Sequence, residues 1–154
     1  MNITIRRANP REWQIVQKLI HEVFISDAQH DPHLDLTWPF SEDGIERYKK
    51  YVTDPTFIAF IAFEGTNPVG LIVGAPKEIS YRTVKMAEIV EIGVTPTHRS
   101  SGIGALLVTR LRQWCRENGY QKLLVNAYCK NTKAISFYKR QGLQPADIDF
   151  EMEP

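Results

Sequence analysis

The sequence predicts a mixed α+β fold, in which helices pack on a mixed sheet. Apolar runs of strand length and stretches of helical periodicity follow one another in the order β-α-α-β-β-β-α-β-α-β. This order alternates too irregularly for a doubly wound parallel sheet, and the segment 56–75 has the pattern of an antiparallel hairpin. With 154 residues the chain is long enough for one hydrophobic core, so we expect residues 1–154 to form a single domain.

The first part of the chain predicts one strand and one helix. Residues Ile3 to Arg7 form the expected strand. Asn9 is expected to cap the helix, with Pro10 at its first position and Glu12 where a capping box places a carboxylate. The helix is expected to fade around Asp27. Its apolar face comprises Trp13, Val16, Ile20, Val23 and Phe24.

A second helix and a hairpin follow a polar stretch at residues 28–40. Ser41 is expected to cap the helix, whose one face carries Ile45, Tyr48 and Val52. Apolar runs from Thr56 to Phe63 and from Val69 to Ala75 then flank a Gly- and Pro-containing turn, which predicts an antiparallel hairpin. Because both runs are continuously apolar, we expect them to be buried on both faces of the sheet.

The second half of the chain predicts three strands and two helices. Met86 to Thr95 is an expected strand, and the helix after it is expected to end near Gly119. Lys122 to Tyr128 is the next strand, and Asn131 is expected to cap a helix through Arg140. Ile148 to Met152 supplies a short last strand. The helix that is expected to end near Gly119 has an apolar face that comprises Ile103, Leu106, Leu107, Leu111 and Trp114.

Composition narrows the classes of function. Apolar residues make up 43% of the chain and charged residues 24%, which is typical of a soluble globular protein. The net charge of +1, with basic residues scattered among carboxylates, argues against a nucleic-acid partner. No run resembles a signal peptide or approaches the roughly 20 apolar residues of a membrane span, so we expect a cytoplasmic protein without a membrane partner. Cys115 and Cys129 are expected to be reduced thiols.

One segment between a strand and a helix has the composition of an anion-binding turn. It consists of Arg99, Ser100, Ser101, Gly102, Ile103 and Gly104. At a helix start, free backbone N–H groups and the positive end of the helix dipole favour a phosphate, and glycines let its oxygens approach. An ordinary helix start with small residues for packing is the alternative interpretation. The segment lacks the third glycine of a dinucleotide fingerprint, and the chain contains no G-K-[ST] of a P-loop.

Two motifs carry a family resemblance. The run V-T-P-T-H-R-S-S-G-I-G-A-L-L, followed by N-T-K-A-I-S-F-Y-K-R-Q-G-L, resembles the GNAT N-acetyltransferase superfamily over residues 87–143. The resemblance implies acetyl-CoA as acyl donor and direct attack by a primary amine of a small molecule or a protein in a ternary complex, and we expect no metal. Homodimers are common among similar proteins, so the resemblance also makes a homodimer possible here, although the sequence indicates no interface. Position Ser101, often basic in the family, departs from the pattern.

The resemblance also assigns the remaining donor-binding residues. It implies that strand 86–95 diverges from strand 122–128, that pantetheine enters the gap, and that the backbone N–H of Val94 polarises the thioester carbonyl. Gly93, inside that strand, is expected to mark a bulge or a close approach of another group. Asn131, besides capping a helix, is expected to meet the pantetheine arm.

Three residues are candidates for the chemistry. An ammonium acceptor must lose a proton before it attacks, and Glu88 and Glu91 are the candidate bases. Strict alternation along the strand would put the two side chains on opposite faces, but a bulge would change the alternation, so the choice of base stays open. The alternative interpretation is that both are solvated charges at a strand edge without a catalytic role. By resemblance, Tyr138 donates a proton to the departing thiolate. Since neighbouring helical residues cannot face the same way, we expect Phe137 to be in the core and Tyr138 in the site.

The sequence says least about the residues that would bind the acceptor amine. His30, Asp31, His33 and Asp35 are metal-ligating residue types, but their spacing in an irregular loop fixes no geometry. With Trp38, Phe40 and Tyr81 they could instead surround a cationic amine, or form only a surface loop. Two other functions stay open, namely a CoA-binding module without turnover and an unrelated phosphate-binding protein.

Overall fold

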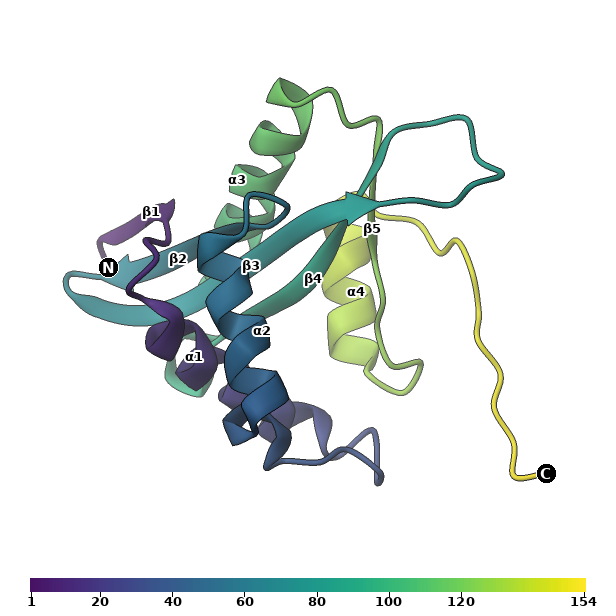
Figure 1. Cartoon of the computed structure of the whole chain (residues 1–154), viewed down its shortest axis with the longest axis horizontal. Coiled ribbons are helices and arrows are strands. Elements are labelled where there is room, and N and C mark those ends of the chain that lie inside the picture. Colours follow the sequence, from purple (N-terminus) through teal and green to yellow (C-terminus); the bar gives the residue numbers. More distant parts are fainter.

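The sheet has five strands in the order β1-β2-β3-β4-β5 (Figure 1), as seen in a computed structural model that describes residues 1–154. The first four strands are antiparallel neighbours, whereas β5 pairs parallel to β4. The predicted mixed sheet and the hairpin are therefore confirmed. The strands are β1 (Ile3–Arg7), β2 (Ile58–Glu64), β3 (Asn67–Lys77), β4 (Met86–Val94) and β5 (Lys122–Val125).

Helices cover both faces of the sheet. Helices α1 (Trp13–Asp27) and α2 (Glu42–Thr53) pack on one face, and α3 (Ile103–Glu117) packs on the other (Figure 1). Helix α4 (Thr132–Arg140) follows β5 in the chain, and the 3-10 turns η1 (Trp38–Phe40) and η2 (Pro96–His98) precede α2 and α3. None of the helices has both the length and the apolar character needed to cross a bilayer.

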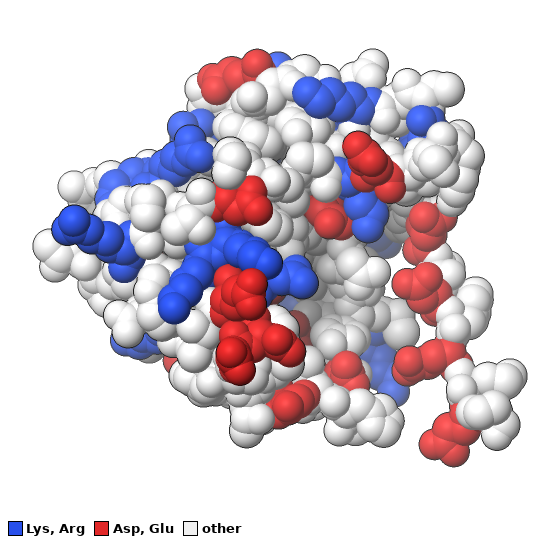
Figure 2. Space-filling model, viewed as in Figure 1, with Lys and Arg blue, Asp and Glu red and all other residues white.

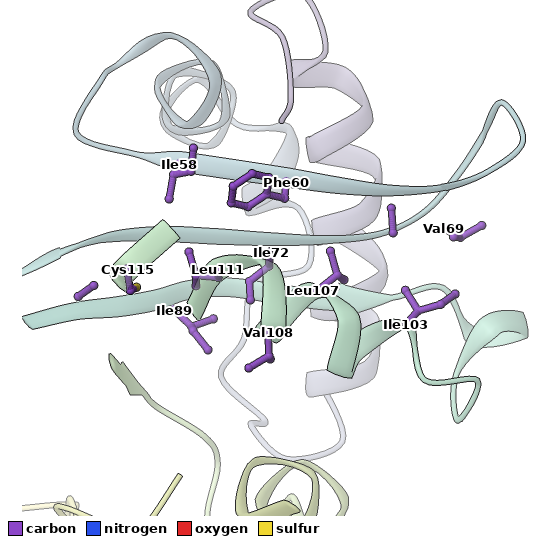
Figure 3. Close-up of a cluster of buried hydrophobic side chains, with 12 residues drawn as sticks. Ile58, Phe60, Val69, Ile72, Ile89, Ile103, Leu107, Val108, Leu111 and Cys115 are labelled. Atoms are coloured by element: carbon purple, nitrogen blue, oxygen red, sulfur yellow. The ribbon is translucent and has the colours of Figure 1, made fainter. Parts of the chain in front are cut away.

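Each face of the sheet has its own hydrophobic cluster. On the α3 face, Leu107 and Leu111 of the helix pack over Phe60 and Ile72 of the central strands (Figure 3). On the other face the cluster joins α1, α2 and the same strands. It contains Val16, Leu19, Ile20, Tyr48, Tyr51, Ala59, Ile61, Leu71 and Val73. Strands β2 and β3 are thus buried on both faces, as their apolar runs predict.

Helix caps agree with the sequence at two of three places. The Ser41 hydroxyl accepts from the Gly44 N–H (3.1 Å), and the Asn131 side chain accepts from the Ala134 N–H (3.1 Å). The expected cap at Asn9 is wrong, because α1 begins at Trp13 after Glu12, although the Glu12 carboxylate accepts from the Asn9 N–H (2.9 Å) as the predicted capping box requires. Instead, the Asn9 side chain accepts from the N–H two residues on (3.0 Å) and its carbonyl from the Glu12 N–H (3.0 Å), which makes an isolated turn before the helix.

The expected last strand is also wrong. Residues 148–152 have no strand partner, and Ile148, Phe150 and Met152 are 73%, 92% and 86% exposed. Alternation of apolar and acidic residues predicts which side chains share a face, but a strand also needs a neighbour with free backbone groups. The acidic side chains of this segment follow one another along its length (Figure 2), whereas basic and acidic side chains are interleaved over the rest of the visible face.

Candidate active site

Strands β4 and β5 separate part of the way along their length. Their pairing runs from Met86–Lys122 to Ile89–Val125 and stops there, so the second half of β4 has no neighbour on this edge. The Thr95 N–H donates to the Val69 carbonyl of β3 (2.9 Å). Because backbone groups alternate along a strand, the N–H and carbonyl of Val94 face the opposite edge. The predicted divergence of the two strands is therefore present, and Val94 faces the gap.

A bulge in β4 decides which way the two candidate bases face. Between the pairs Val73–Glu91 and Gly74–Ile89, β4 contains one residue more than β3, namely Val90. Ile89 and Ile92 contact the α3-side cluster, whereas Val90 contacts the cluster under α1 and α2. The extra residue changes the alternation, so that Glu88 and Glu91 lie on the same face, toward α1 and α2.

Gly93 is not the bulged residue, since it pairs regularly with Leu71. Its second expected role, a close approach of another group, is what the structure contains. A Cβ at Gly93 would overlap Cγ2 of Val23 in α1. The absence of a side chain thus brings α1 against β4 beside the gap, and the carboxyl end of α1, at Asp27, comes with it.

The turn before α3 presents a series of unpaired backbone donors. Ser100 and Gly102 have positive φ values of 60° and 87°, a conformation in which successive N–H groups form a concave anion site. The N–H groups from Ser100 to Ala105 donate to no other group of the chain. They lie at the positive end of the 15-residue helix α3. This arrangement suits an anion such as a phosphate.

Side chains of the turn have other partners. The Arg99 Nε donates to the Val94 carbonyl (3.1 Å), which places the guanidinium at the mouth of the gap. The Ser101 hydroxyl donates to the carbonyl of His98, and the buried Ile103 fixes the start of α3 in the core. At Gly104, a Cβ would lie 3.1 Å from Cζ of Phe137, so this glycine accommodates packing between α3 and α4.

Glu91 is a carboxylate enclosed beneath two helices. Burial raises its pKa to about 7, and the charge of Asp27 adds to that increase. The Tyr51 hydroxyl, which donates to Oε1 of Glu91 at 3.5 Å, and the charge of Arg47 lower the pKa. A carboxyl group with a pKa near neutrality can exchange a proton with an amine at physiological pH.

Glu88 has a different environment on the same face. Its carboxylate lies 3.3 Å from Nζ of Lys77, and 34% of the Glu88 side chain is exposed. An exposed ion pair of this kind contributes little to stability and leaves the carboxylate bound to a neighbouring cation. Glu88 therefore matches the interpretation as a solvated strand charge better than Glu91 does.

Phe137 and Tyr138 face different ways, as helical geometry predicts. Phe137 packs against the cluster under α3, next to Gly104. Burial, followed by the negative charges of Asp27 and Glu91, raises the pKa of Tyr138 to about 12. The phenol of Tyr138 is thus close to both carboxylates and keeps its proton at neutral pH. Its helix begins at the cap that Asn131 forms with the Ala134 N–H.

The structure adds residues that the sequence did not single out. Asp27 ends α1, and burial raises its pKa, while the charges of His30 and Arg99 oppose that increase. Tyr51 reaches Glu91 across 40 positions of sequence. The only local signal for Tyr51 is its position three residues after Tyr48, which puts both on one face of α2. No local signal exists for Asp27, because the packing of α1 on β4 brings it to the site.

The acidic loop before α2 has structural contacts. Asp31 accepts from the His33 N–H (2.9 Å) and from the Tyr128 hydroxyl (3.0 Å). Asp35 accepts from the N–H and hydroxyl of Thr37 (2.9 and 2.6 Å). Both carboxylates therefore shape turns, and Asp31 also ties the loop to the chain after β5.

The expected aromatic residues of the acceptor side are only partly brought together. Trp38 stacks on Phe24 at 6.1 Å between ring centroids and therefore lies over α1. Phe40 is exposed and packs edge-on against His21 (4.8 Å). Tyr81 is 88% exposed in the loop between β3 and β4, so it matches the alternative interpretation as a surface-loop residue.

One cavity of the molecule is separate from the gap. It has a volume of about 440 Å³ and lies between the end of α2 and the chain after β1. None of the predicted site residues lines it, and Tyr51 is the one residue that it shares with the surroundings of Glu91. We therefore place the candidate active site at the gap, where donors, carboxylates and the phenol of Tyr138 converge.

The mixed sheet, the two parallel strands that separate and the turn of unpaired N–H groups before α3 together define a class of protein, namely α+β proteins whose sheet opens beside a helix start suited to an anion. The model of the acetyltransferase (GNAT) family matches residues 19–143, and the chain belongs to this family. The family predicted from the two motifs is thereby confirmed.

The relatives found by sequence match this chain over only part of their own length. The amino-acid acetyltransferase of Proteus mirabilis is 27% identical over 117 residues, which are 75% of this chain and 25% of that protein. The chain thus spans about a quarter of the length of the amino-acid acetyltransferases that it matches.

Solved structures share the fold over their whole length. The tetramutant of the BH1408 protein from Bacillus halodurans has a TM-score of 0.86 at 16% identity, covering 98% of this chain and 99% of that one. AAC(6')-Iy in complex with the bisubstrate analogue CoA-S-monomethyl-acetylneamine has a TM-score of 0.77 at 14% identity, covering 100% and 99%. The α+β fold predicted from the sequence is therefore that of the acetyltransferase family.

Proposed function

We propose that this protein transfers an acetyl group from acetyl-CoA to a primary amine, by direct attack of the amine in a ternary complex. The observation that carries the proposal is the convergence of three groups on the gap between β4 and β5. These are the unpaired N–H groups before α3, the enclosed carboxylate of Glu91 and the phenol of Tyr138. The CoA-containing bisubstrate analogue bound to the fold relative AAC(6')-Iy supports the choice of acyl donor.

The donor would be held mainly by backbone groups. The turn from Ser100 to Gly104 offers the pyrophosphate its unpaired N–H groups at the start of α3. Arg99 adds a positive charge at the mouth of the gap. The pantetheine arm would occupy the gap, within reach of the amide of Asn131, and the N–H of Val94 would donate to the thioester carbonyl as negative charge develops on its oxygen.

The two catalytic roles follow from charge and burial. Glu91, with a pKa of about 7, is partly ionised at neutral pH and can accept the proton that the ammonium group must lose. The free amine then attacks the thioester carbon, and the carbon–sulfur bond breaks as the new amide forms. Tyr138, which is protonated at neutral pH, donates to the departing sulfur.

The acceptor is proposed only as a class. The fold relative AAC(6')-Iy is in complex with a bisubstrate analogue that contains an acetylneamine group, and several sequence relatives are named amino-acid acetyltransferases, so amino acids and aminoglycosides head the set to be tested. The acceptor would approach from the side of α1 and α2, because Glu91 and Asp27 face that side.

A thiol-release assay tests the proposal. The protein is incubated with acetyl-CoA and a panel of amino acids, aminoglycosides and simple alkylamines, and thermal shift is measured with CoA and with NAD. We expect stabilisation by CoA but not by NAD, and acceptor-dependent release of CoA. Binding of CoA without turnover on any amine would instead indicate a CoA-binding module. No stabilisation by CoA would contradict the donor site altogether.

The assignment of the base has a matched control on the same strand. Glu91→Gln is expected to lower kcat by about a hundredfold, within the usual range for a general base. Glu88→Gln removes a carboxylate of the same strand and face, and is expected to keep the rate within about twofold, since this carboxylate belongs to an exposed ion pair. The reverse result would transfer the role of base to Glu88.

A further inference from the structure

Two tyrosines of α2 point into the molecule beneath Glu91. Tyr48 is fully buried and Tyr51 is 3% exposed. Their hydroxyl groups differ in one respect: the Tyr51 hydroxyl donates to Oε1 of Glu91 (3.5 Å), whereas the buried hydroxyl of Tyr48 has no partner in the chain. A buried hydroxyl costs free energy unless it is hydrogen-bonded. The contact with Glu91 thus satisfies the Tyr51 hydroxyl, whereas the Tyr48 hydroxyl stays unsatisfied.

The ring of Tyr51 is held rigidly by its neighbours. It packs edge-on against Phe57 with 5.0 Å between ring centroids, and lies 5.9 Å from the ring of Tyr48. All three rings belong to the cluster that fills the space between α2 and the sheet. The position of the Tyr51 hydroxyl oxygen is therefore fixed by packing of the ring, and its O–H can turn toward the carboxylate.

We propose that Tyr51 is the positioning residue of the base, holding Oε1 of Glu91 so that Oε2 is left to accept the proton of the acceptor amine. This inference rests on the proposed function, in which Glu91 is the base. A carboxylate held by one rigid donor keeps one oxygen engaged and turns the other in a fixed direction. Tyr51 would act through Glu91 and would not itself touch the substrate.

The groups around Glu91 determine in which direction its pKa would change if the Tyr51 hydroxyl were lost. Asp27 opposes ionisation of Glu91, whereas Arg47 and the hydrogen bond from Tyr51 favour it. Among these groups Tyr51 is the one that hydrogen-bonds Glu91, and Tyr138 of α4 is a neutral phenol. The groups that face Glu91 are Asp27 of α1, Arg47, Tyr48 and Tyr51 of α2, and Tyr138 of α4.

Loss of the Tyr51 hydroxyl should raise the pKa of Glu91, because the ionised form loses a donor. The acid limb of the kcat/KM profile would then move to higher pH. At pH 6.5 we expect a rate roughly threefold to tenfold lower, which is the effect of one hydrogen bond, and a smaller loss at pH 9.

Tyr51→Phe and Tyr48→Phe make a matched pair for the test, since both remove one hydroxyl from a buried tyrosine of the same helix. The kcat/KM profile between pH 5.5 and 9.5 and the titration of the Glu91 carboxyl by carbon-13 NMR are measured for both. We expect Tyr51→Phe to move both titrations to higher pH and Tyr48→Phe to move neither. Equal behaviour of the two variants would overturn the inference.

A second variant keeps the test informative if Tyr51→Phe unfolds. 3-Fluorotyrosine at position 51 retains the ring and the hydroxyl, but its O–H is more acidic and donates a stronger hydrogen bond. It should move the titration of Glu91 to lower pH, opposite to the effect of removing the hydroxyl. An unchanged titration in the folded fluorinated protein would also overturn the inference.

The outcome is separable from that of the proposed function. If Glu91→Gln keeps the full rate, the proposed base is wrong, whatever Tyr51 does. If Glu91→Gln loses activity while the NMR titration of Glu91 is the same in wild type and Tyr51→Phe, the base stands and the positioning role is wrong.

Discussion

Val23 of α1 packs directly on the bare backbone of Gly93 in β4, and no Cβ fits between them. The contact lies one helical turn before Asp27 and two residues after Glu91. It therefore sets the distance between the helix and the strand that carry these two carboxylates. A glycine that the sequence marks as unusual thus serves the site by admitting a helix.

Gly93→Ala should push α1 away from β4. Inserting a methyl group into a packed contact costs about 2 kcal/mol of unfolding free energy, or roughly 6 °C in Tm for a chain of this size. Thermal unfolding of Gly93→Ala, Val23→Ala and the double variant measures the coupling of the two positions. We expect Val23→Ala to recover most of the loss, because it makes room for the new methyl. Additive losses in the double variant would show that the clash lies elsewhere.

Gly102 offers a test of the anion-binding turn. It has a φ of 87°, and a Cβ placed there would have no atom within 4 Å, so a side chain would face open space next to the unpaired N–H groups. Gly102→Asp should weaken CoA binding by about tenfold to a hundredfold, because its carboxylate opposes the pyrophosphate. Isothermal titration with CoA measures the loss.

Gly102→Asn is the control for this substitution. Asparagine has nearly the size of aspartate and tolerates positive φ, but it carries no charge. Its CoA affinity should stay within a fewfold of that of the unmodified protein. If the two variants weaken CoA equally, backbone strain and not charge accounts for the loss.

The parts of the structure that could be predicted depend on local patterns. The hairpin of β2 and β3, the cap at Ser41 and the turn before α3 each come from a few neighbouring residues whose chemistry has one common use. The family motifs added the direction of Tyr138, since a helix fixes how adjacent side chains diverge.

The parts that could not be predicted depend on contacts distant in sequence. A bulge at Val90, an apolar residue in an apolar strand, leaves no local mark, yet it puts Glu88 and Glu91 on one face. Tyr51 and Asp27 meet Glu91 only because α1 and α2 pack on that face. The segment 148–152 shows the converse, since its strand-like alternation has no neighbouring strand to pair with.

Glu91→Gln should also stabilise the protein, in a way that depends on pH. The pKa of Glu91 is raised from 4.5 unfolded to about 7 folded, so the folded state binds more protons than the unfolded state between these values. Stability is therefore lost as pH rises from 4.5 to 7. Glutamine has no such charge to bury.

The difference between the two proteins should grow over that window and then stay constant at about 3.5 kcal/mol, since the pKa rises from 4.5 to about 7 and each pKa unit corresponds to about 1.4 kcal/mol. Urea unfolding of Glu91→Gln and of wild type at pH 5 and pH 8 measures it. A difference that is equal at the two pH values would contradict burial of the Glu91 charge.

Tyr138→Phe should lower kcat while leaving the affinity for acetyl-CoA unchanged. The phenol, whose pKa is raised to about 12, is neutral at neutral pH and can donate only while the sulfur acquires charge. We expect kcat to fall by about tenfold to a hundredfold, with Kd for CoA within twofold.

Tyr120→Phe is the matched control for Tyr138→Phe, because Tyr120 packs against Trp114 away from the gap. Its kcat should equal that of wild type. The raised pKa of Tyr138 further implies that the rate of wild type stays level from pH 8 to pH 10, since the phenol keeps its proton over this range. If Tyr138→Phe keeps the full rate, then another donor must protonate the thiolate, and the nearness of Tyr138 to Asp27 and Glu91 would serve only to orient the acceptor.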